Sequence, residues 1–250
     1  MRSQLIDLSK WNAAWDPTGA EKKIDGVIMR ASYGLVPDRL FETFYPISLS
    51  IPVRGVYHYF SSGSSWQDQA GFFLNQIEGK DIHFMVLDFE RSYNHMSAEF
   101  AVDAGNWMAD VGRRSQKRVL LYTNASTYDE WLTPYCDWME RWQLWIAQYP
   151  YRHWNSYLES IQTESTIKPW LPKGRHDWTI WQYSADGNQR GGLFGVKSRD
   201  VDINVYNGTP EELQNWAGID SVTTVASGRD GRVIEILNDM QAVIDRHRRM

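Results

Sequence analysis

The chain has 250 residues, of which 42% are hydrophobic and 23% are charged, which is typical of one large globular domain with a sizeable core. The formal net charge is −5 and the first 220 residues hold no basic block, so a nucleic acid is not an expected partner. The single cysteine, Cys136, excludes an internal disulfide and a cysteine-based zinc cluster, and we expect it to be a buried thiol.

Short β-rich segments alternate with helical segments along most of the chain. Strands are predicted at 4–9, 25–32, 52–60, 83–90, 117–124, 143–150, 177–184 and 199–206, and helices at 38–50, 64–79, 97–114 and 126–141. The clearest helix follows Ser97 as its N-cap, with apolar residues from Phe100 to Val111 at helical spacing. Segments 151–176 and 185–198 are rich in Gly, Pro and polar residues, so they are expected to be loops.

This alternation predicts an α/β fold with a closed barrel. Near-continuous apolar strands are typical of a parallel sheet covered by helices, and eight strands fit a barrel whose last part is poor in helices. Residues 1–217 are expected to form this barrel, with 218–250 as a linker and a short amphipathic helical tail. Self-association through the tail helix is the preferred prediction. The alternatives are docking of the helix on its own barrel, or contact of the basic ending DRHRRM with anionic polymers.

Carboxylates occur where barrel enzymes place their chemistry, at the ends of the strands. Asp7 ends the first predicted strand, Asp88 and Glu90 end the fourth, and Asp202 lies on the eighth. Side chains at i and i+2 of a strand share a face, so Asp88 and Glu90 repel and one should keep its proton to higher pH. One protonated and one ionised carboxyl group is the pair that glycosidic cleavage uses. The alternative is a solvated strand end with incidental acids.

Other chemistries find less support in the sequence. Asp200 and Asp202 could hold a hard cation, but the histidines are scattered, so we expect no metal site and no cofactor. His58 is expected to be a buried, hydrogen-bonded ring. No nucleophile elbow and no phosphate-binding glycine loop occur. Thirteen Trp and thirteen Tyr are unusual, and those not needed in the core suggest a cleft lined with rings that suit sugars.

Eight segments carry a resemblance to a known family. They are IDLSKWN, GVIMRASYG, GVYHYF, VLDFE, LLYTN, LWIAQYP, IWQYSADG and VDINVYNG, within residues 4–208. Their order resembles glycoside hydrolase family 25, the Chalaropsis-type lysozymes. The resemblance implies an irregular TIM-like (β/α)5(β)3 barrel and an N-acetylmuramidase that cleaves the β-1,4 bond from N-acetylmuramic acid to N-acetylglucosamine in peptidoglycan.

The resemblance also implies roles for individual residues. Glu90 matches the proton donor, Asp88 the acid that assists through the substrate's N-acetyl group or charge, and Asp7 and Asp202 the other acids of the pocket. The positions that match the sugar cleft are Tyr59, Tyr122, Trp145, Gln148, Tyr149, Trp181 and Gln182, for whose aromatic rings core packing is the alternative. Retention of configuration is expected, because acids at i and i+2 can approach to about 5–6 Å.

Two rival functions stay open at this point. One is a glycan-binding barrel without activity, and the other is a glycosidase for chitin-like polymers. The sequence shows no secretory signal and no run of roughly 20 apolar residues for a membrane span. We therefore expect a protein made in the cytoplasm that reaches the bacterial wall after release, as bacteriophage endolysins do.

Overall fold

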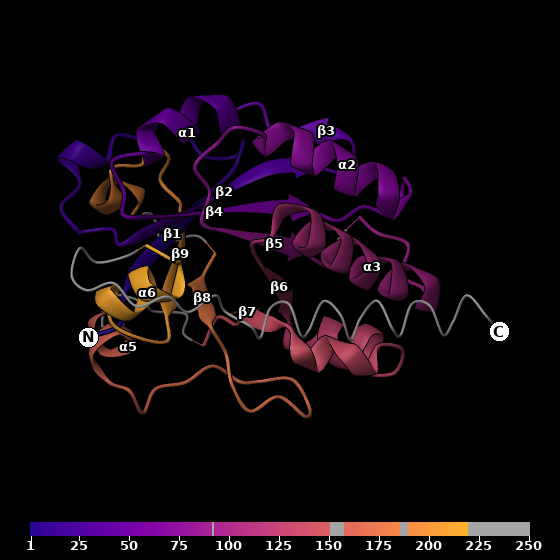
Figure 1. The fold of residues 1–250 in the computed structure, drawn as a ribbon. Coiled ribbons are helices and arrows are strands. Elements are labelled where there is room, and N and C mark those ends of the chain that lie inside the picture. Colours follow the sequence, from indigo (N-terminus) through magenta and orange to yellow (C-terminus); the bar gives the residue numbers. More distant parts are fainter. Residues whose placement is uncertain (92, 151–157, 186–189, 220–250) are drawn as a thin grey trace, which may run out of the picture.

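The computed structural model describes residues 1–91, 93–150, 158–185 and 190–219 (Figure 1). The predicted tail helix and most of its linker lie outside the described residues.

Eight strands close into a barrel, as the sequence pattern predicted. The ring consists of β1 (Gln4–Leu8), β2 (Gly26–Tyr33), β4 (Val53–Tyr59), β5 (Phe84–Asp88), β6 (Arg118–Asn124), β7 (Gln143–Ala147), β8 (Ile180–Ser184) and β9 (Asp202–Tyr206). Pairing of β1 with both β2 and β9 closes the ring. The two-residue strand β3 (Val36–Pro37) pairs with β2 outside it. Each strand lies within, or within one residue of, its predicted range.

One strand runs against the predicted direction. Seven strands are parallel in sequence order, but β9 is antiparallel to both β8 and β1. A parallel return would need a crossover of a dozen or more residues, usually a helix. The described part of the β8–β9 connection contains only a short 3-10 turn, Gly191–Phe194, and no crossover helix. The expectation of an all-parallel sheet is therefore wrong for the last strand.

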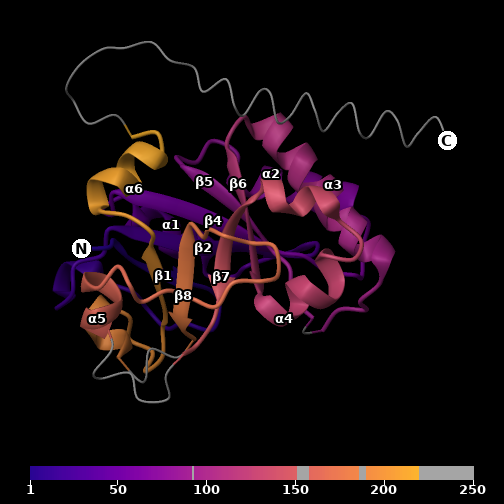
Figure 2. The same ribbon diagram turned by 90° about the horizontal axis from the view of Figure 1, so that it is seen from below.

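Three helices cover the outer face of the first half of the barrel. They are α1 (Phe41–Ser48), α2 (Trp66–Ile77) and α3 (Ala98–Ser115), which lie side by side outside β2, β4 and β5 (Figures 1 and 2). The predicted N-cap is confirmed, because the Ser97 hydroxyl accepts a hydrogen bond from the Phe100 N–H at 3.0 Å. These helices confirm three of the four predicted helical segments.

The fourth predicted helix, 126–141, is broken into short turns. The chain forms α4 (Ala125–Thr127), a π-helical turn at Tyr128–Leu132 and a 3-10 turn at Asp137–Arg141. Pro134 lies between the last two, and a proline inside a helix removes a hydrogen bond and disfavours the helical conformation before it. The apolar periodicity alone did not reveal this break.

Two short helices were not predicted, α5 (Leu158–Thr163) and α6 (Pro210–Trp216). A signal for α6 was present, because Thr209 and Glu212 form a capping box around Pro210. This helix lies at the end of the barrel where the parallel strands begin. The Trp216 indole N–H donates to Gln143, the first residue of β7, and its ring packs 5.0 Å from the ring of Phe84, the first residue of β5.

Side chains alternate between two buried layers. The larger layer lies between the strands and the helices, and contains Trp107 and Trp181. The smaller layer fills the barrel, from Leu5 and Phe84 near one end to Tyr122 and Trp145 near the other, and is completed by Leu213 and Ala217 of the α6 region. A filled barrel has no pore, so chemistry must occur at one of its ends.

A glycine makes room for the largest ring at the start of β5. A Cβ atom on Gly55 would lie 2.3 Å from the Phe84 side chain, which is fully buried inside the barrel. No other residue fits there without displacement of that ring.

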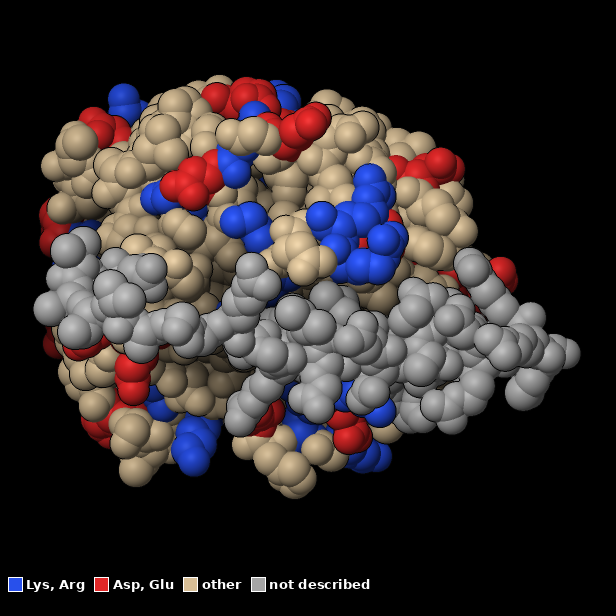
Figure 3. All heavy atoms as spheres, viewed as in Figure 1, with Lys and Arg blue, Asp and Glu red and all other residues tan. Residues whose placement is uncertain are grey.

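The described surface carries charges of both signs. On the face shown in Figure 3, Lys and Arg gather in one cluster near the centre right, and Asp and Glu lie mainly above it and at the edges. No helix in the described part of the chain is long and apolar enough to cross a membrane.

Candidate active site

The four predicted acids lie at the same end of the barrel. Asp7 near the end of β1 pairs in register with Asp202, the first residue of β9. Asp88 ends β5, and Glu90 follows two residues later. Because β9 is antiparallel, its first residue lies beside the last residues of the parallel strands. The reversal of β9 thus brings Asp202 to the end that holds Asp7, Asp88 and Glu90; these four acids are called the acidic mouth below.

Asp7 is held in the mouth by two side-chain amides. Its Oδ2 accepts hydrogen bonds from Gln182 Nε2 and Asn204 Nδ2, both at 2.8 Å. Burial raises the pKa of Asp7, and the hydrogen bonds from Asn204 and Gln182 oppose this rise because they favour the ionised form. The carboxyl group is thus fixed in position by groups that match a carboxylate.

The two amides are themselves fixed by aromatic side chains. Gln182 Oε1 accepts hydrogen bonds from the hydroxyls of Tyr122, at 2.8 Å, and Tyr149, at 2.7 Å. Asn204 Oδ1 accepts one from the indole N–H of Trp145 at 2.8 Å. Each amide oxygen therefore receives its proton donors from a ring, which leaves the amide N–H groups oriented toward Asp7.

Asp88 and Glu90 form the chemically unusual pair of the mouth. Asp88 is 5% exposed, whereas Glu90 is partly exposed. Burial and the neighbouring Glu90 raise the pKa of Asp88 well above its ordinary value, against the opposing charge of Arg30. Burial also raises the pKa of Glu90, while a hydrogen bond from Tyr122 lowers it. The pair therefore keeps a proton to higher pH than a free carboxylic acid does.

One oxygen of Asp88 has no hydrogen-bond partner. Oδ1 is buried and receives no donor from the part of the chain that the structure describes. A buried acceptor left unpaired destabilises the fold. This oxygen is therefore available to a donor from a ligand when the carboxyl group turns.

The backbone of Glu90 is fixed by a residue that the sequence hypothesis missed. Asn94 Nδ2 donates to the carbonyls of Glu90, at 2.8 Å, and Phe60, at 3.0 Å, and its Oδ1 accepts from the Ser62 N–H at 3.0 Å. The side chain thus ties the segment after β5 to the segment after β4.

A buried cation lies on the β2 side of the mouth. Arg30 Nε is 2.7 Å from Asp38 Oδ2, and both side chains are almost fully buried. Asp38 also accepts the backbone N–H groups of Lys10 and Leu40, each at 2.9 Å. These hydrogen bonds fix Asp38, which in turn holds Arg30 in place. The charge of Arg30 opposes the rise that burial causes in the pKa of both Asp7 and Asp88.

Five of the seven predicted cleft residues are tyrosines or glutamines, and the other two are tryptophans. Tyr59 pairs in register with Asp88 and stacks on Tyr33 at 4.6 Å, and Tyr122, Tyr149 and Gln182 join the network around Asp7. Gln148 holds the backbone N–H of the exposed Trp170 through its Oε1 at 3.0 Å.

The two predicted tryptophans are not exposed to a ligand. Trp145 lies inside the barrel, 1% exposed, where it orients Asn204. Trp181 lies on the outer face of β8, fully buried, and donates its indole N–H to the Gln148 carbonyl at 2.8 Å. Strand alternation already separates Trp181 from Gln182, since adjacent residues point to opposite faces.

The carboxyl pair at the mouth is suited to proton transfer. No group of three or more His, Cys, Asp or Glu side chains suited to a metal ion occurs among the described residues. His58 is confirmed as a buried structural ring, with Nδ1 2.8 Å from the Ser32 hydroxyl and Nε2 3.1 Å from Gln69 Oε1. A partly exposed carboxyl with a raised pKa, beside a second carboxyl, can act as a general acid and then as a general base.

Comparison with known proteins agrees with this geometry. The family model described as glycosyl hydrolases family 25 matches residues 6–192. The uncharacterized protein YegX of Escherichia coli O6:H1 is 27% identical over 221 residues, covering 84% of this chain and 72% of that protein. Lysozyme M1 of Streptomyces globisporus is 28% identical over 224 residues, covering 84% and 69%.

A solved structure shares the fold. A family 25 glycosyl hydrolase from Bacillus anthracis superimposes with a TM-score of 0.68 at 23% identity, covering 86% of this chain and 93% of that one. The family match spans most of the barrel and includes Asp7, Asp88 and Glu90. The resemblance seen in the eight sequence segments is thereby confirmed, and the chain belongs to glycosyl hydrolases family 25 and is a glycoside hydrolase.

Proposed function

We propose that this chain is a lysozyme, an N-acetylmuramidase that hydrolyses the β-1,4 bond between N-acetylmuramic acid and N-acetylglucosamine in bacterial peptidoglycan. The observation that carries the proposal is the pairing of a partly exposed Glu90 with a buried Asp88, both with a raised pKa, at the end of a filled barrel. The relative named Lysozyme M1 supports the choice of substrate.

Glu90 is the proton donor in this proposal. It is the more exposed carboxyl of the pair, so it can reach the glycosidic oxygen of a bound glycan. Its raised pKa keeps the proton available until the bond breaks, and the proton passes to the leaving sugar's oxygen. Glu90 then takes a proton from the water that completes hydrolysis.

Asp88 acts on the substrate's own acetamido group. Its carboxyl group turns so that one oxygen accepts the acetamido N–H, and the acetamido oxygen attacks the anomeric carbon as the leaving group departs. A bond forms from this oxygen to the anomeric carbon while the glycosidic bond breaks, and water later opens the ring from the opposite face. Two inversions give net retention, without a covalent bond to the protein.

Digestion of purified peptidoglycan tests the substrate bond. Mass spectrometry of the products should find N-acetylmuramic acid at the new reducing ends. Reducing ends of N-acetylglucosamine, cleavage of peptide bonds alone, or faster turnover of chitin oligomers would each contradict the muramidase proposal. Binding without turnover would instead identify an inactive glycan-binding barrel.

The first-formed anomer tests the stereochemistry separately. Proton NMR during the first turnovers should show the β anomer from the β-linked substrate, and an α anomer would establish inversion. The proposed setting is the bacterial wall, reached after release from the cell in which the protein is made, as for bacteriophage endolysins. Lysis from outside by the purified protein, compared with lysis after expression inside bacteria, tests that setting.

A further inference from the structure

We infer that Tyr122 is a positioning residue whose hydroxyl turns from Gln182 to Glu90 when Glu90 loses its proton, so that the state of the acid is linked to the Asp7 network. This inference rests on the proposed function, since it concerns the acid of that reaction. The acceptor that links the two sites is Gln182 Oε1, which has more donors than it needs.

Gln182 Oε1 receives two hydroxyl groups, from Tyr122 at 2.8 Å and from Tyr149 at 2.7 Å. One donor is enough to fix the amide, because the Gln182 N–H is already committed to Asp7 Oδ2 at 2.8 Å. The Tyr122 hydroxyl can therefore leave Gln182 without leaving a buried acceptor unpaired. The Tyr149 hydroxyl keeps the amide, and hence Asp7, in place.

The second acceptor for Tyr122 is Glu90. Tyr122 lies on β6 in register with Asp88 on β5, so it is on the strand beside the segment that carries Glu90 two residues further on. A hydrogen bond from Tyr122 lowers the pKa of Glu90, whereas Tyr149 interacts with Glu90 through charge alone and with Tyr122 through a hydrogen bond. A phenol has one proton, so Tyr122 can donate to Gln182 or to Glu90 but not to both at full strength. A carboxylate is the stronger acceptor and a carboxylic acid the weaker, which sets the direction of the turn.

Tyr122 keeps its proton throughout. Its hydroxyl is buried and faces the nearby Tyr149 and three acids, which together raise the pKa of Tyr122 well above that of a free phenol. No proton passes from Tyr122 to Glu90; the hydroxyl rotates about its C–O bond and stabilises the anion that remains after Glu90 has protonated the leaving oxygen. Titratable or charged groups that surround the pair are Asp7 on β1, Arg30 on β2, Tyr57 and Tyr59 on β4, Asp88 on β5, Tyr149 after β7 and Asp202 on β9.

A matched pair of variants tests the inference. Tyr122→Phe and Tyr149→Phe each remove one hydroxyl from the same acceptor, but only Tyr122→Phe removes a donor from Glu90. The readout is the pH dependence of kcat/KM on soluble peptidoglycan fragments, whose alkaline limb reports loss of the acid's proton. Without the hydrogen bond to its ionised form, Glu90 should hold its proton longer, so the limb should move upward by about half to one pH unit in Tyr122→Phe. It should stay within about 0.2 unit of wild type in Tyr149→Phe.

Site-specific replacement of Tyr122 by 3-fluorotyrosine gives a second measurement that keeps the side chain's shape. Its more acidic phenol is a better donor, so the limb should move downward. Equal limbs in Tyr122→Phe and Tyr149→Phe, or an unmoved limb with fluorotyrosine at 122, would overturn the inference while wild-type turnover leaves the proposed function intact. Failure of the wild-type protein to cleave the fragments would refute the proposed function instead. A misfolded Tyr122→Phe protein would leave the decision to the fluorotyrosine limb.

Discussion

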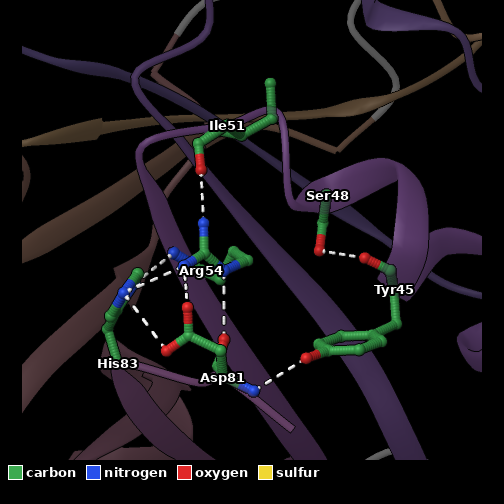
Figure 4. Close-up of polar contacts among 6 residues, drawn as sticks. All are labelled: Tyr45, Ser48, Ile51, Arg54, Asp81 and His83. Carbon is green, nitrogen blue, oxygen red and sulfur yellow. Dashed lines mark hydrogen bonds and ion pairs between the residues drawn. The ribbon is translucent and has the colours of Figure 1, made fainter.

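Charged groups have opposite surroundings at the two ends of the barrel, with complementary partners at one end and like charges at the other. Near the end where the parallel strands begin lies a network of Tyr45, Ser48, Ile51, Arg54, Asp81 and His83, called the floor network here (Figure 4). Within it, acceptors of Ile51 and Asp81 and the ring of His83 surround the guanidinium of Arg54. At the acidic mouth, four carboxyls gather instead, and burial together with neighbouring charge raises the pKa of Asp88 and Glu90.

The floor network is built from complementary partners. Arg54 donates to the Ile51 carbonyl at 2.6 Å, to the Asp81 carbonyl at 3.0 Å and to the Asp81 carboxylate. Its backbone N–H donates to Nδ1 of His83 at 2.9 Å, and the Asp81 N–H donates to the Tyr45 hydroxyl at 2.7 Å. Such an arrangement stabilises the fold, whereas clustered like charges oppose it and persist where chemistry requires them.

The comparison predicts that changes at the mouth remove activity and changes at the floor remove stability. The largest expected effect is that of Glu90→Gln, which should lower turnover by about 10²- to 10⁴-fold, because the amide keeps the shape but cannot donate the proton. The melting temperature should stay level or rise, since a buried like-charge contact with Asp88 is relieved.

The matched control is Glu99→Gln, at the exposed first turn of α3, which makes the same chemical change at a solvent-exposed carboxylate that is not one of the four acids of the mouth. Turnover on soluble wall fragments and thermal unfolding would be measured for both proteins. A Glu90→Gln protein with wild-type turnover would remove Glu90 from the acid's role, and a large loss in Glu99→Gln would show that the effect is not specific to the mouth.

Arg54→Met tests the floor. The change leaves two carbonyls and one carboxylate without their donor, so the free energy of unfolding should fall by about 2–3 kcal/mol. Turnover per folded molecule should stay within about twofold of wild type. Arg113→Met is the control, because Arg113 pairs with Asp110 at the surface, where an ion pair contributes under about 1 kcal/mol.

Denaturant unfolding measures both changes. Equal loss of stability in Arg54→Met and Arg113→Met would erase the distinction between the floor network and an ordinary surface pair. A large loss of turnover in folded Arg54→Met would instead show that the floor acts on the mouth.

Most of the barrel and the mouth could be read from the sequence, because both depend on local patterns. Apolar strand runs locate the eight strands, and Asp88 and Glu90 share a face through strand alternation alone. The direction of β9 could not be read, since it depends on how the chain returns after β8. For Trp181 the sequence left both a cleft position and core packing open, and the structure places the ring in the core layer outside the barrel.

The supporting residues were missed for a different reason. Asn94 and Asn204 act through partners far away in the sequence, at Phe60 and Asp7. Arg30 pairs with Asp38, which is nearby in the sequence but lies beyond the end of β2. No spacing rule connects Asn204 with Asp7 across 197 positions before the register of β1 and β9 is known. Pairing of buried polar groups is a tertiary property, and only the closed ring reveals it.

Two histidines with a lowered pKa, His83 and His58, should make the stability of the fold depend on pH. Burial and the Arg54 charge lower the pKa of His83 to about 4, and burial lowers the pKa of His58 to about 3, both from about 6.5 in the unfolded chain. At these two rings the unfolded state therefore binds more protons below pH 6.5, so the stability that they contribute is fully present above pH 6.5 and falls as the pH drops. The raised pKa values of Asp7, Asp88 and Glu90 act in the opposite direction, because these groups hold protons in the folded state that they release in the unfolded state.

Substitution of one histidine tests this origin. His83→Asn can keep an acceptor for the Arg54 N–H but cannot titrate, so it should flatten the loss of stability between pH 6.5 and 4 without abolishing it, because His58 remains. Urea unfolding across this range measures the slope. An unchanged slope would show that His83 does not contribute, and acid-induced loss of activity with constant stability would place the sensitivity at the mouth instead.

The smallest effect is expected from removal of residues 220–250. The barrel's inner layer is completed by Leu213 and Ala217, and the Ile219 N–H still donates to the Gln214 carbonyl at 3.0 Å while its side chain packs against that layer. A chain ending at Ile219 therefore keeps the closure at the floor end and should cleave soluble wall fragments within about twofold of the full-length rate.

The predicted apolar stripe from Val233 to Ile244 should instead support self-association, so light scattering should find a larger mass for the full chain than for the truncated one. Equal monomeric masses would refute self-association through the tail, and loss of turnover on soluble fragments would show that the removed residues support the barrel itself.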